Sequence, residues 1–141
     1  MPGNKSLQLN QYYANPANQF WNILSFITSA DFNTDYEIKK RMLLKYHIAI
    51  WDVLMHCERE GSLDINISDE VSNDFGIFLP KYPNIKAVFF NGSKAERLYG
   101  TYNLYDPKKS YITLPSTSSA NTSMTFEKKS KIWKESIAKF L

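Results

Sequence analysis

The chain has 141 residues, of which 43% are hydrophobic and 22% charged, so it fits one globular domain and is neither disordered nor collagen-like. No apolar run approaches the ~20 residues of a transmembrane helix, and no signal segment opens the chain, so we expect a cytoplasmic protein. The single cysteine, Cys57, excludes an internal disulfide framework and a cysteine-rich zinc site.

Positive charge is concentrated toward the C-terminal end of the sequence. Residues 1–106 carry 10 Lys and Arg against 12 Asp and Glu, whereas residues 107–141 carry 7 Lys against 2 Glu, which gives +3 for the chain. A basic surface attracts polyanions such as nucleic acid. A solvated helix face is the alternative explanation for such a charge run, and charge alone favours that alternative.

The first third of the sequence predicts two helices and a strand. Asn15 followed by Pro16 is typical of a helix start, and apolar residues over 20–27 then recur at helical spacing. A capping box predicts a second helix over about 34–46. The short apolar run 48–54 predicts a buried strand.

The rest of the sequence alternates between helices and strands. The predicted order is a helix over about 72–79, a strand over 85–90, a helix over 93–99, a strand over 111–114, and a last helix capped by Thr125. Strands separated by helices indicate a single α/β domain over residues 1–141 with a mostly parallel sheet. Ligands of such sheets bind outside the carboxyl ends of the strands.

Five segments carry a resemblance to a known family. They are Met-Pro-Gly-x-x-Ser-Leu with the run from Gln11 to Trp21, then residues 51–54, 57–64, 89–92 (Phe-Phe-Asn-Gly) and 114–118 (Leu-Pro-Ser-Thr-Ser). In this order and spacing they resemble the uracil-DNA glycosylase superfamily, and its hypoxanthine (deoxyinosine) DNA glycosylase branch most of all. The resemblance covers nearly the whole chain and implies a three-layer α/β/α sandwich around a short, mostly parallel sheet. Members of the branch have a strand and a Gly before Met-Pro-Gly, so we expect the first strand to be truncated here.

The resemblance implies a monofunctional DNA glycosylase of base-excision repair. Such an enzyme flips a damaged base out of DNA and cuts the bond between the base and its deoxyribose. The implied base is hypoxanthine, with uracil as a second candidate. Water is the nucleophile, so neither a metal nor another cofactor is expected. The expected partner is DNA that contains deaminated bases, bound by a nucleoid-associated monomer with no membrane contact.

The resemblance assigns catalysis to Asn18. Related branches carry an Asp or Asn at the place that Met1 occupies here, and a methionine cannot orient water. The Asn before Phe-Trp is the implied substitute, because its carbonyl can orient a water and preorganised electrostatics then supply much of the rate. The alternative is that Asn18 bonds the local backbone near a helix start.

The resemblance also implies three base-binding residues. Phe20 is the stacking wall for the flipped base, although its spacing fits a core stripe equally well. Asn91 matches the N–H/C=O edge that uracil and hypoxanthine share, whereas Asn-Gly alone is typical of a turn. Tyr13 lines the pocket entrance, or is an ordinary core or surface aromatic residue.

Contacts to the DNA backbone are implied for two loops. Small residues let the backbone approach the nucleic acid, and hydroxyl groups are common phosphate ligands. The residues are Pro2, Gly3 and Ser6 of the first motif and Ser116, Thr117 and Ser118 of the second. An ordinary solvated Ser/Thr loop is the alternative for the second motif.

Two other functions remain open at this point. One is a catalytically weak or inactive DNA-binding module of the same fold, because the first strand and the first-motif acid are missing. The other is a different α/β enzyme that acts on a free nucleobase or nucleoside, which the basic C-terminal third disfavours.

Overall fold

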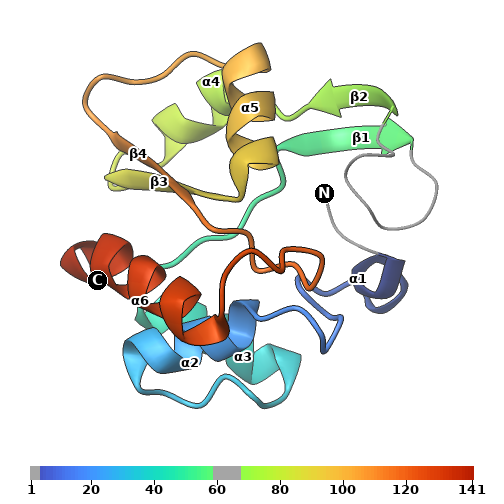
Figure 1. Ribbon diagram of the computed structural model, residues 1–141. Helices are drawn as coiled ribbons and strands as arrows, with labels where there is room; N and C mark the ends of the chain where they lie inside the picture. The colour runs from blue at the N-terminus through green and yellow to red at the C-terminus, as the bar shows by residue number, and fades with distance from the viewer. Residues whose placement is uncertain (1–3, 59–67) are drawn as a thin grey trace. The chain divides into compact units, whose positions relative to one another are not determined.

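The computed structural model describes residues 4–58 and 68–141, which form two compact units. Unit 1 is the segment Asp52–Ser116, and unit 2 combines the chain up to Trp51 with Thr117–Leu141 (Figure 1). The chain therefore leaves unit 2 once and returns to it once. A single domain over the whole chain stays a prediction.

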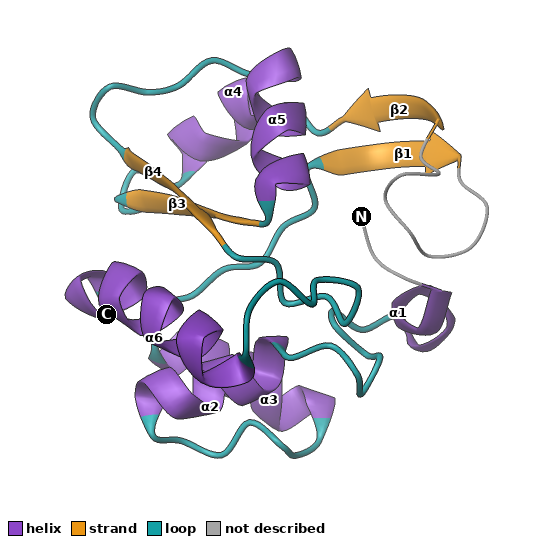
Figure 2. Ribbon diagram, in the orientation of Figure 1, coloured by secondary structure: helices purple, strands orange, loops and turns teal. Residues whose placement is uncertain are grey.

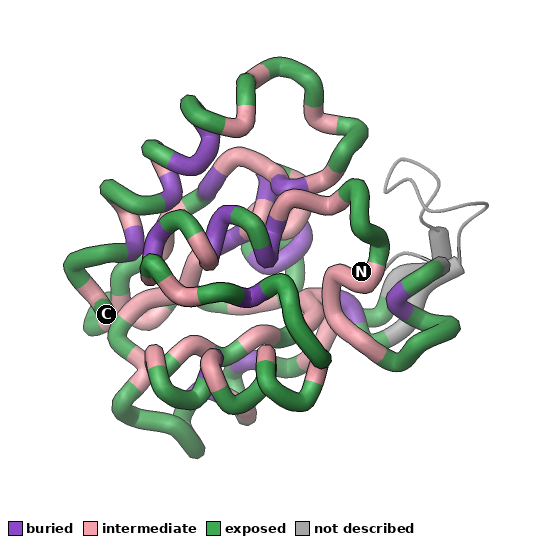
Figure 3. The backbone as a smooth tube through the Cα atoms, turned by 90° about the horizontal axis from the view of Figure 1, so that it is seen from below, coloured by how far each residue is buried: buried purple, intermediate pink, exposed green. Residues whose placement is uncertain are grey.

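Unit 2 is helical. Its elements are α1 (Asn4–Leu9), α2 (Phe20–Thr28), α3 (Tyr36–Lys45), α6 (Phe126–Ile137) and the 3-10 helix η3 (Ala138–Phe140). Helices α2 and α6 pack together, because both carry apolar side chains at helical spacing. Figure 3 shows how buried and exposed positions alternate along the helices.

The start of α6 is as predicted, but the predicted starts of α2 and α3 were wrong. Thr125 caps α6 by accepting a hydrogen bond from the Lys128 N–H at 3.2 Å. Helix α2 begins at Phe20 and not near Pro16, because the Asn15 side chain accepts from the Ala17 N–H and forms a local turn instead of a helix cap. Helix α3 begins at Tyr36 after Asp35, and the predicted capping box is absent from it.

Unit 1 holds all four described strands. Its elements are β1 (Leu54–Glu58), β2 (Ser68–Ser72), α4 (Phe75–Phe78), the 3-10 helix η2 (Leu79–Lys81), β3 (Ala87–Asn91), α5 (Ser93–Tyr102) and β4 (Ser110–Leu114). Strands β3 and β4 are parallel, as predicted, and β1 and β2 form an antiparallel pair that the sequence does not indicate (Figure 2). Helix α5 contacts β2, β3 and β4.

Aromatic rings form the core of unit 1. Phe75, Leu79, Phe90 and Tyr99 pack into one buried cluster, and Tyr111 packs against it. The Phe90 and Tyr99 ring centroids are 5.2 Å apart, a usual separation for aromatic pairs. Burial raises the pKa of the Tyr99 hydroxyl, so this ring stays neutral in the core.

The strand predicted over 48–54 was wrong, because its first residues complete α3. The helix closes with His47 in the left-handed region (φ 56°), and the Ile48 N–H donates to the Leu43 carbonyl at 2.9 Å. This is a Schellman arrangement, which satisfies the last carbonyls of the helix. The strand itself begins at Leu54.

The helix predicted over 72–79 is a single turn, α4, followed by η2.

None of the described helices is both long and apolar enough to span a membrane.

Candidate active site

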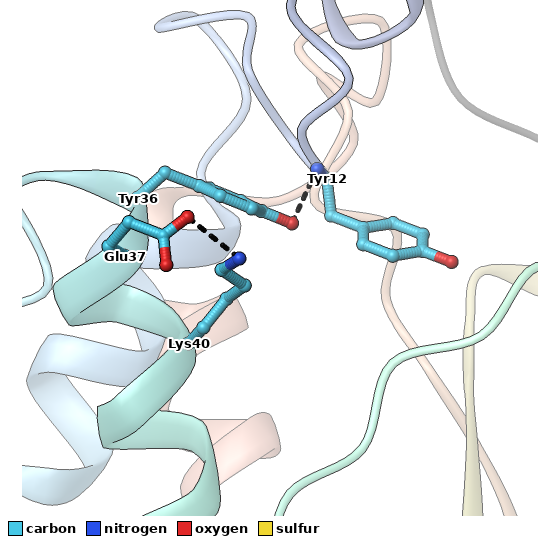
Figure 4. Close-up of polar contacts among 4 residues, drawn as sticks. All are labelled: Tyr12, Tyr36, Glu37 and Lys40. Carbon is cyan, nitrogen blue, oxygen red and sulfur yellow. Dashed lines mark hydrogen bonds and ion pairs between the residues drawn. The ribbon is translucent and has the colours of Figure 1, made fainter.

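The loop over residues 10–19 of unit 2, here called the first loop, is held in place from three sides. The Ser6 hydroxyl accepts from the Ala14 N–H at 3.0 Å. The Tyr12 N–H donates to the Tyr36 hydroxyl at 3.1 Å, and the Tyr12 ring points away from α3 (Figure 4). The Trp21 indole N–H donates to the Tyr12 carbonyl at 3.3 Å. A loop with its backbone groups paired in this way is preorganised.

Asn18 lies near the end of the first loop, and Gln19 separates it from α2. Its Oδ1 accepts from the Phe20 N–H at 3.0 Å, and its own N–H donates to the Asn15 carbonyl at 2.9 Å. The local backbone hydrogen bond expected as the alternative to catalysis therefore exists. It uses one of two lone pairs, so the carbonyl can accept a second hydrogen bond, for example from a water molecule. Asn18 is partly buried.

Phe20 is the first residue of α2 and is 6% exposed. Its ring stacks on Tyr13 with the centroids 4.0 Å apart and the planes 23° from parallel. Trp21 and Trp133 meet the Phe20 ring edge-to-face. The structure thus brings the two predicted base-binding aromatics of unit 2 into direct contact. Tyr13 has φ 52°, a region that costs a non-glycine residue about 1–2 kcal/mol.

Lys129 is a residue that the sequence motifs do not mark as part of the site. It belongs to the basic C-terminal run but is only 1% exposed, and its Nζ donates to Gln19 Oε1 at 2.9 Å. Burial lowers the pKa of the Lys129 amine. The signal was present in the sequence, because Lys129, Trp133 and Ile137 are spaced by four and occupy one buried stripe of α6.

The second predicted loop, residues 115–118 and here called the second loop, directly follows β4. Thr117 is fully buried, and its carbonyl accepts from the Gln19 N–H at 3.0 Å, which ties this loop to the first loop within unit 2. Ser118 is partly buried, and its hydroxyl accepts from the Ala120 N–H at 3.2 Å. The loop is therefore anchored at Thr117, while its phosphate contacts stay a prediction.

In unit 1 the ends of the two parallel strands lie together. Asn91 is in register with Leu114, and the Gly92 N–H donates to the Leu114 carbonyl at 2.9 Å. Gly92 has φ 95°, and a Cβ there would lie 3.1 Å from the Ser116 Cβ. Glycine is therefore required at this position for the Asn91 turn to approach Ser116.

The predicted site residues thus fall into two groups. Unit 2 brings together Asn18, Phe20 and Tyr13, with buried Ser6 supporting the loop that carries them. Unit 1 brings together Asn91 and Ser116. Pro2 and Gly3 lie outside the described residues. The described residues contain no group of three His, Cys, Asp or Glu side chains that could hold a metal ion.

Comparisons with known proteins identify relatives of this chain. A hypoxanthine DNA glycosylase of Methanosarcina barkeri is 38% identical over 96 residues, which cover 67% of this chain and 61% of the relative. The chain thus spans less than two thirds of that relative. A hypoxanthine DNA glycosylase of Methanosarcina acetivorans is 36% identical over 124 residues, which cover 86% of this chain and 76% of the relative. No family model matches the chain.

A solved structure is also similar. The solution NMR structure of a candidate uracil DNA glycosylase from Methanosarcina acetivorans matches with a TM-score of 0.78 and 33% identity, covering 95% of this chain and 82% of that one. This match confirms the predicted α/β fold class. Together with the two relatives, it means that the chain belongs to the uracil-DNA glycosylase superfamily, in the branch of the hypoxanthine DNA glycosylases.

Proposed function

We propose that this protein is a monofunctional DNA glycosylase that removes a deaminated base from DNA. Hypoxanthine is the first candidate base and uracil the second. The observation that carries the proposal is the turn in which Asn18 Oδ1 accepts the Phe20 N–H at 3.0 Å, because it fixes a water-orienting amide beside an aromatic ring. The family membership adds the reaction class.

Asn18 is the proposed catalytic residue. Its carbonyl oxygen orients a water molecule toward the anomeric carbon of the flipped nucleotide. The bond from this carbon to the base breaks, the electron pair leaves with the base, and the water oxygen bonds to the carbon and releases a proton to solvent. An amide is not a base near neutral pH, so the rate depends on preorganised placement of the water and of polar groups.

The proposed base-binding residues are Tyr13 and Phe20 in unit 2 and Asn91 in unit 1. Tyr13 is stacked on the buried Phe20 ring, so the base is proposed to stack on Tyr13 with Phe20 supporting it, a contact worth roughly 1–3 kcal/mol. The Asn91 amide both donates and accepts, so it pairs with the N–H/C=O edge shared by hypoxanthine and uracil. The position of Asn91 at the carboxyl end of β3 is where parallel sheets bind their ligands.

Backbone phosphates are the proposed ligands of the two loops. Ser116 and Ser118 follow β4, and their amide and hydroxyl groups are of the kind that contacts phosphate. Thr117 lies between them but is fully buried, so we propose that it contributes by holding this loop to Gln19. Pro2 and Gly3 are proposed to act in the same way. Ser6 is buried with its hydroxyl engaged, so we propose that it contributes by fixing the first loop. DNA is bound by a monomer that associates with the nucleoid.

The test uses the full chain and oligonucleotides that contain one deoxyinosine or one deoxyuridine. We expect release of free hypoxanthine without added metal, and loss of that release in Asn18→Ala. No release of either base from the wild type would overturn the proposal. Tight binding to abasic DNA without base release would instead favour the inactive DNA-binding module. The stacking of Tyr13 on Phe20 supports this alternative, because it covers the Phe20 ring.

A further inference from the structure

Lys129 is a buried cation that has no carboxylate partner among the described residues. Its side chain lies on α6, is 1% exposed, and donates from Nζ to the amide oxygen of Gln19 at 2.9 Å. The ion pairs found in the described part of the chain, Lys40–Glu37 and Lys131–Glu135, are both on the surface. Removing an ammonium group from water costs several kcal/mol unless it is paired, so this position is expensive to maintain.

Gln19, the hydrogen-bond partner of Lys129, lies at a central position of the proposed site. Gln19 separates Asn18 from Phe20 in the sequence, so it is the middle residue of the turn that carries both. The Gln19 carbonyl accepts from the Ile23 N–H at 2.9 Å and begins α2, and its own N–H donates to the Thr117 carbonyl at 3.0 Å. Lys129 supplies the remaining attachment, through the side chain.

The contact joins three parts of unit 2 that are far apart in the sequence. Gln19 and Lys129 are 110 residues apart, and Thr117 begins the second segment of unit 2. A charged donor makes a shorter and stronger hydrogen bond than a neutral one, so an ammonium group holds the Gln19 amide more firmly than a hydroxyl would. The turn therefore has a fixed position relative to α6 and to the second loop.

We propose that Lys129 is a positioning residue: through Gln19 it holds Asn18 and Phe20 in the geometry that base excision needs. The role in excision rests on the proposed function, whereas the effect on the turn does not. In this proposal the positive charge acts by strengthening the hydrogen bond to Gln19, and not as a free charge in the site.

Four single variants separate contact from charge. Lys129→Met keeps the aliphatic length and removes the donor. Gln19→Ala removes the acceptor. Gln19→Glu keeps an acceptor oxygen and adds a negative charge beside Nζ. Ser130→Ala is the matched control, because its hydroxyl is buried on the same helix and has no hydrogen-bond partner among the described residues.

Two measurements are made on each variant that melts as a single folded species. The first is the single-turnover rate of hypoxanthine release with protein in excess over DNA. We expect Lys129→Met and Gln19→Ala to be about 10- to 100-fold slower, because a misplacement of about 1 Å can cost this much. Gln19→Glu is expected within about threefold of the wild type, as is Ser130→Ala, since both leave the turn attached.

The second measurement is amide hydrogen exchange of the peptide that contains residues 18–20, in the protein without DNA. We expect faster exchange in Lys129→Met and Gln19→Ala only. This readout does not depend on activity: a wild type without base release overturns the proposed function, while the exchange data still decide on the turn. If Lys129→Met does not fold, Gln19→Ala carries both measurements.

Two results would overturn the inference. A folded Lys129→Met with wild-type rate and exchange would mean that the hydrogen bond to Gln19 positions nothing. A Gln19→Glu variant as slow as Lys129→Met would mean that the free positive charge is required, and not the hydrogen bond.

Discussion

The two units differ in charge and in the kind of site residue they hold. Unit 2 contains ten Lys and Arg against five Asp and Glu, a net charge of +5, whereas unit 1 contains seven against nine, a net charge of −2. Unit 2 carries Asn18 and the Tyr13–Phe20 pair, and unit 1 carries Asn91 at a strand end. The proposed roles differ in the same way: catalysis and most of the attraction of phosphates are assigned to the basic unit, and recognition of the base edge is assigned to Asn91 of the acidic unit.

Both units have aromatic cores, and in both the ring contacts extend beyond the buried residues. In unit 1 they run from buried Tyr99 to Tyr105, which is 45% exposed. In unit 2 the aromatic contacts run from Trp133 through Phe20 to Tyr13, which is partly buried and belongs to the first loop. The same kind of packing thus stabilises one unit and, in the other, also reaches a proposed binding residue.

Loss of the Asn18 amide tests the chemical role of unit 2 and has the largest expected effect. We expect Asn18→Ala to lower the single-turnover rate of hypoxanthine release by about 10²–10³-fold, the usual cost of removing one preorganised polar group. Binding to abasic DNA should change little. Asn22→Ala, at an exposed position on α2, is the control. A rate within a few-fold of the wild type for Asn18→Ala would remove catalysis from this residue.

Loss of the Asn91 amide tests the recognition role of unit 1. We expect Asn91→Ala to lower kcat/KM for hypoxanthine by about 10- to 100-fold, because the variant lacks one hydrogen-bonded edge worth roughly 1–3 kcal/mol. The exposed Asn84→Ala serves as the comparison within the same unit. If Asn91→Ala were to retain full activity and full preference between hypoxanthine and uracil, the proposed division between the units would fail.

The sequence predicted the parts of the structure that depend on local pattern. The strands near 85–90 and 111–114, the helix after Gly92 and the Thr125 cap all follow from apolar runs and capping residues, and the structure places them within a few residues. The motif order also indicated the family. These features are local, so neighbouring residues determine them.

What the sequence could not provide depends on distant partners. Asn15 and Pro16 are typical of a helix start, yet the Asn15 and Asn18 side chains each accept a hydrogen bond within a local turn. Helix α2 therefore begins only at Phe20. The spacing of Lys129 with Trp133 and Ile137 places it on the buried stripe of α6, but its partner Gln19 lies 110 residues earlier, so the sequence does not indicate their hydrogen bond. The β1–β2 pair likewise joins segments whose apolar pattern is weak.

Loss of the Phe20 ring sharpens the contrast between the aromatic cores. Phe20→Leu keeps an apolar side chain in the core but removes the flat ring on which Tyr13, the proposed partner of the base, is stacked. We expect roughly tenfold weaker kcat/KM, at the lower end of the 1–3 kcal/mol per stacked base. Phe20 and Phe90 are both buried, so Phe90→Leu in unit 1 should lower the melting temperature about as much as Phe20→Leu does. Unlike Phe20→Leu, it should cause no specific loss of activity in the folded protein. Equal reductions of activity in both variants would show that Phe20 acts only through stability.

The charge difference between the units predicts a difference in salt dependence. We expect Lys128→Gln with Lys131→Gln, both exposed on α6, to reduce the slope of log K against log salt for DNA binding, by up to about 0.9 for each phosphate that the variant no longer neutralises. Lys81→Gln with Lys86→Gln, two exposed lysines of unit 1, should leave the slope nearly unchanged. The reverse order of the two slopes would contradict the assignment of phosphate binding to unit 2.

The smallest expected effect concerns the pH dependence of stability and again distinguishes Lys129 from the surface lysines. Burial lowers the pKa of Lys129 in the folded protein, whereas the unfolded chain has the ordinary value of 10.5. Between the lowered value and 10.5 the unfolded state binds more protons, so this group adds to the free energy of unfolding as pH rises through that window. Lys129→Met lacks the contribution. The free energy of unfolding of the wild type minus that of Lys129→Met should therefore increase in urea titrations as pH rises toward 10.5. Lys131→Met controls for the loss of one positive charge on α6. A difference that stays constant as pH rises would mean that folding does not lower the pKa of the Lys129 amine.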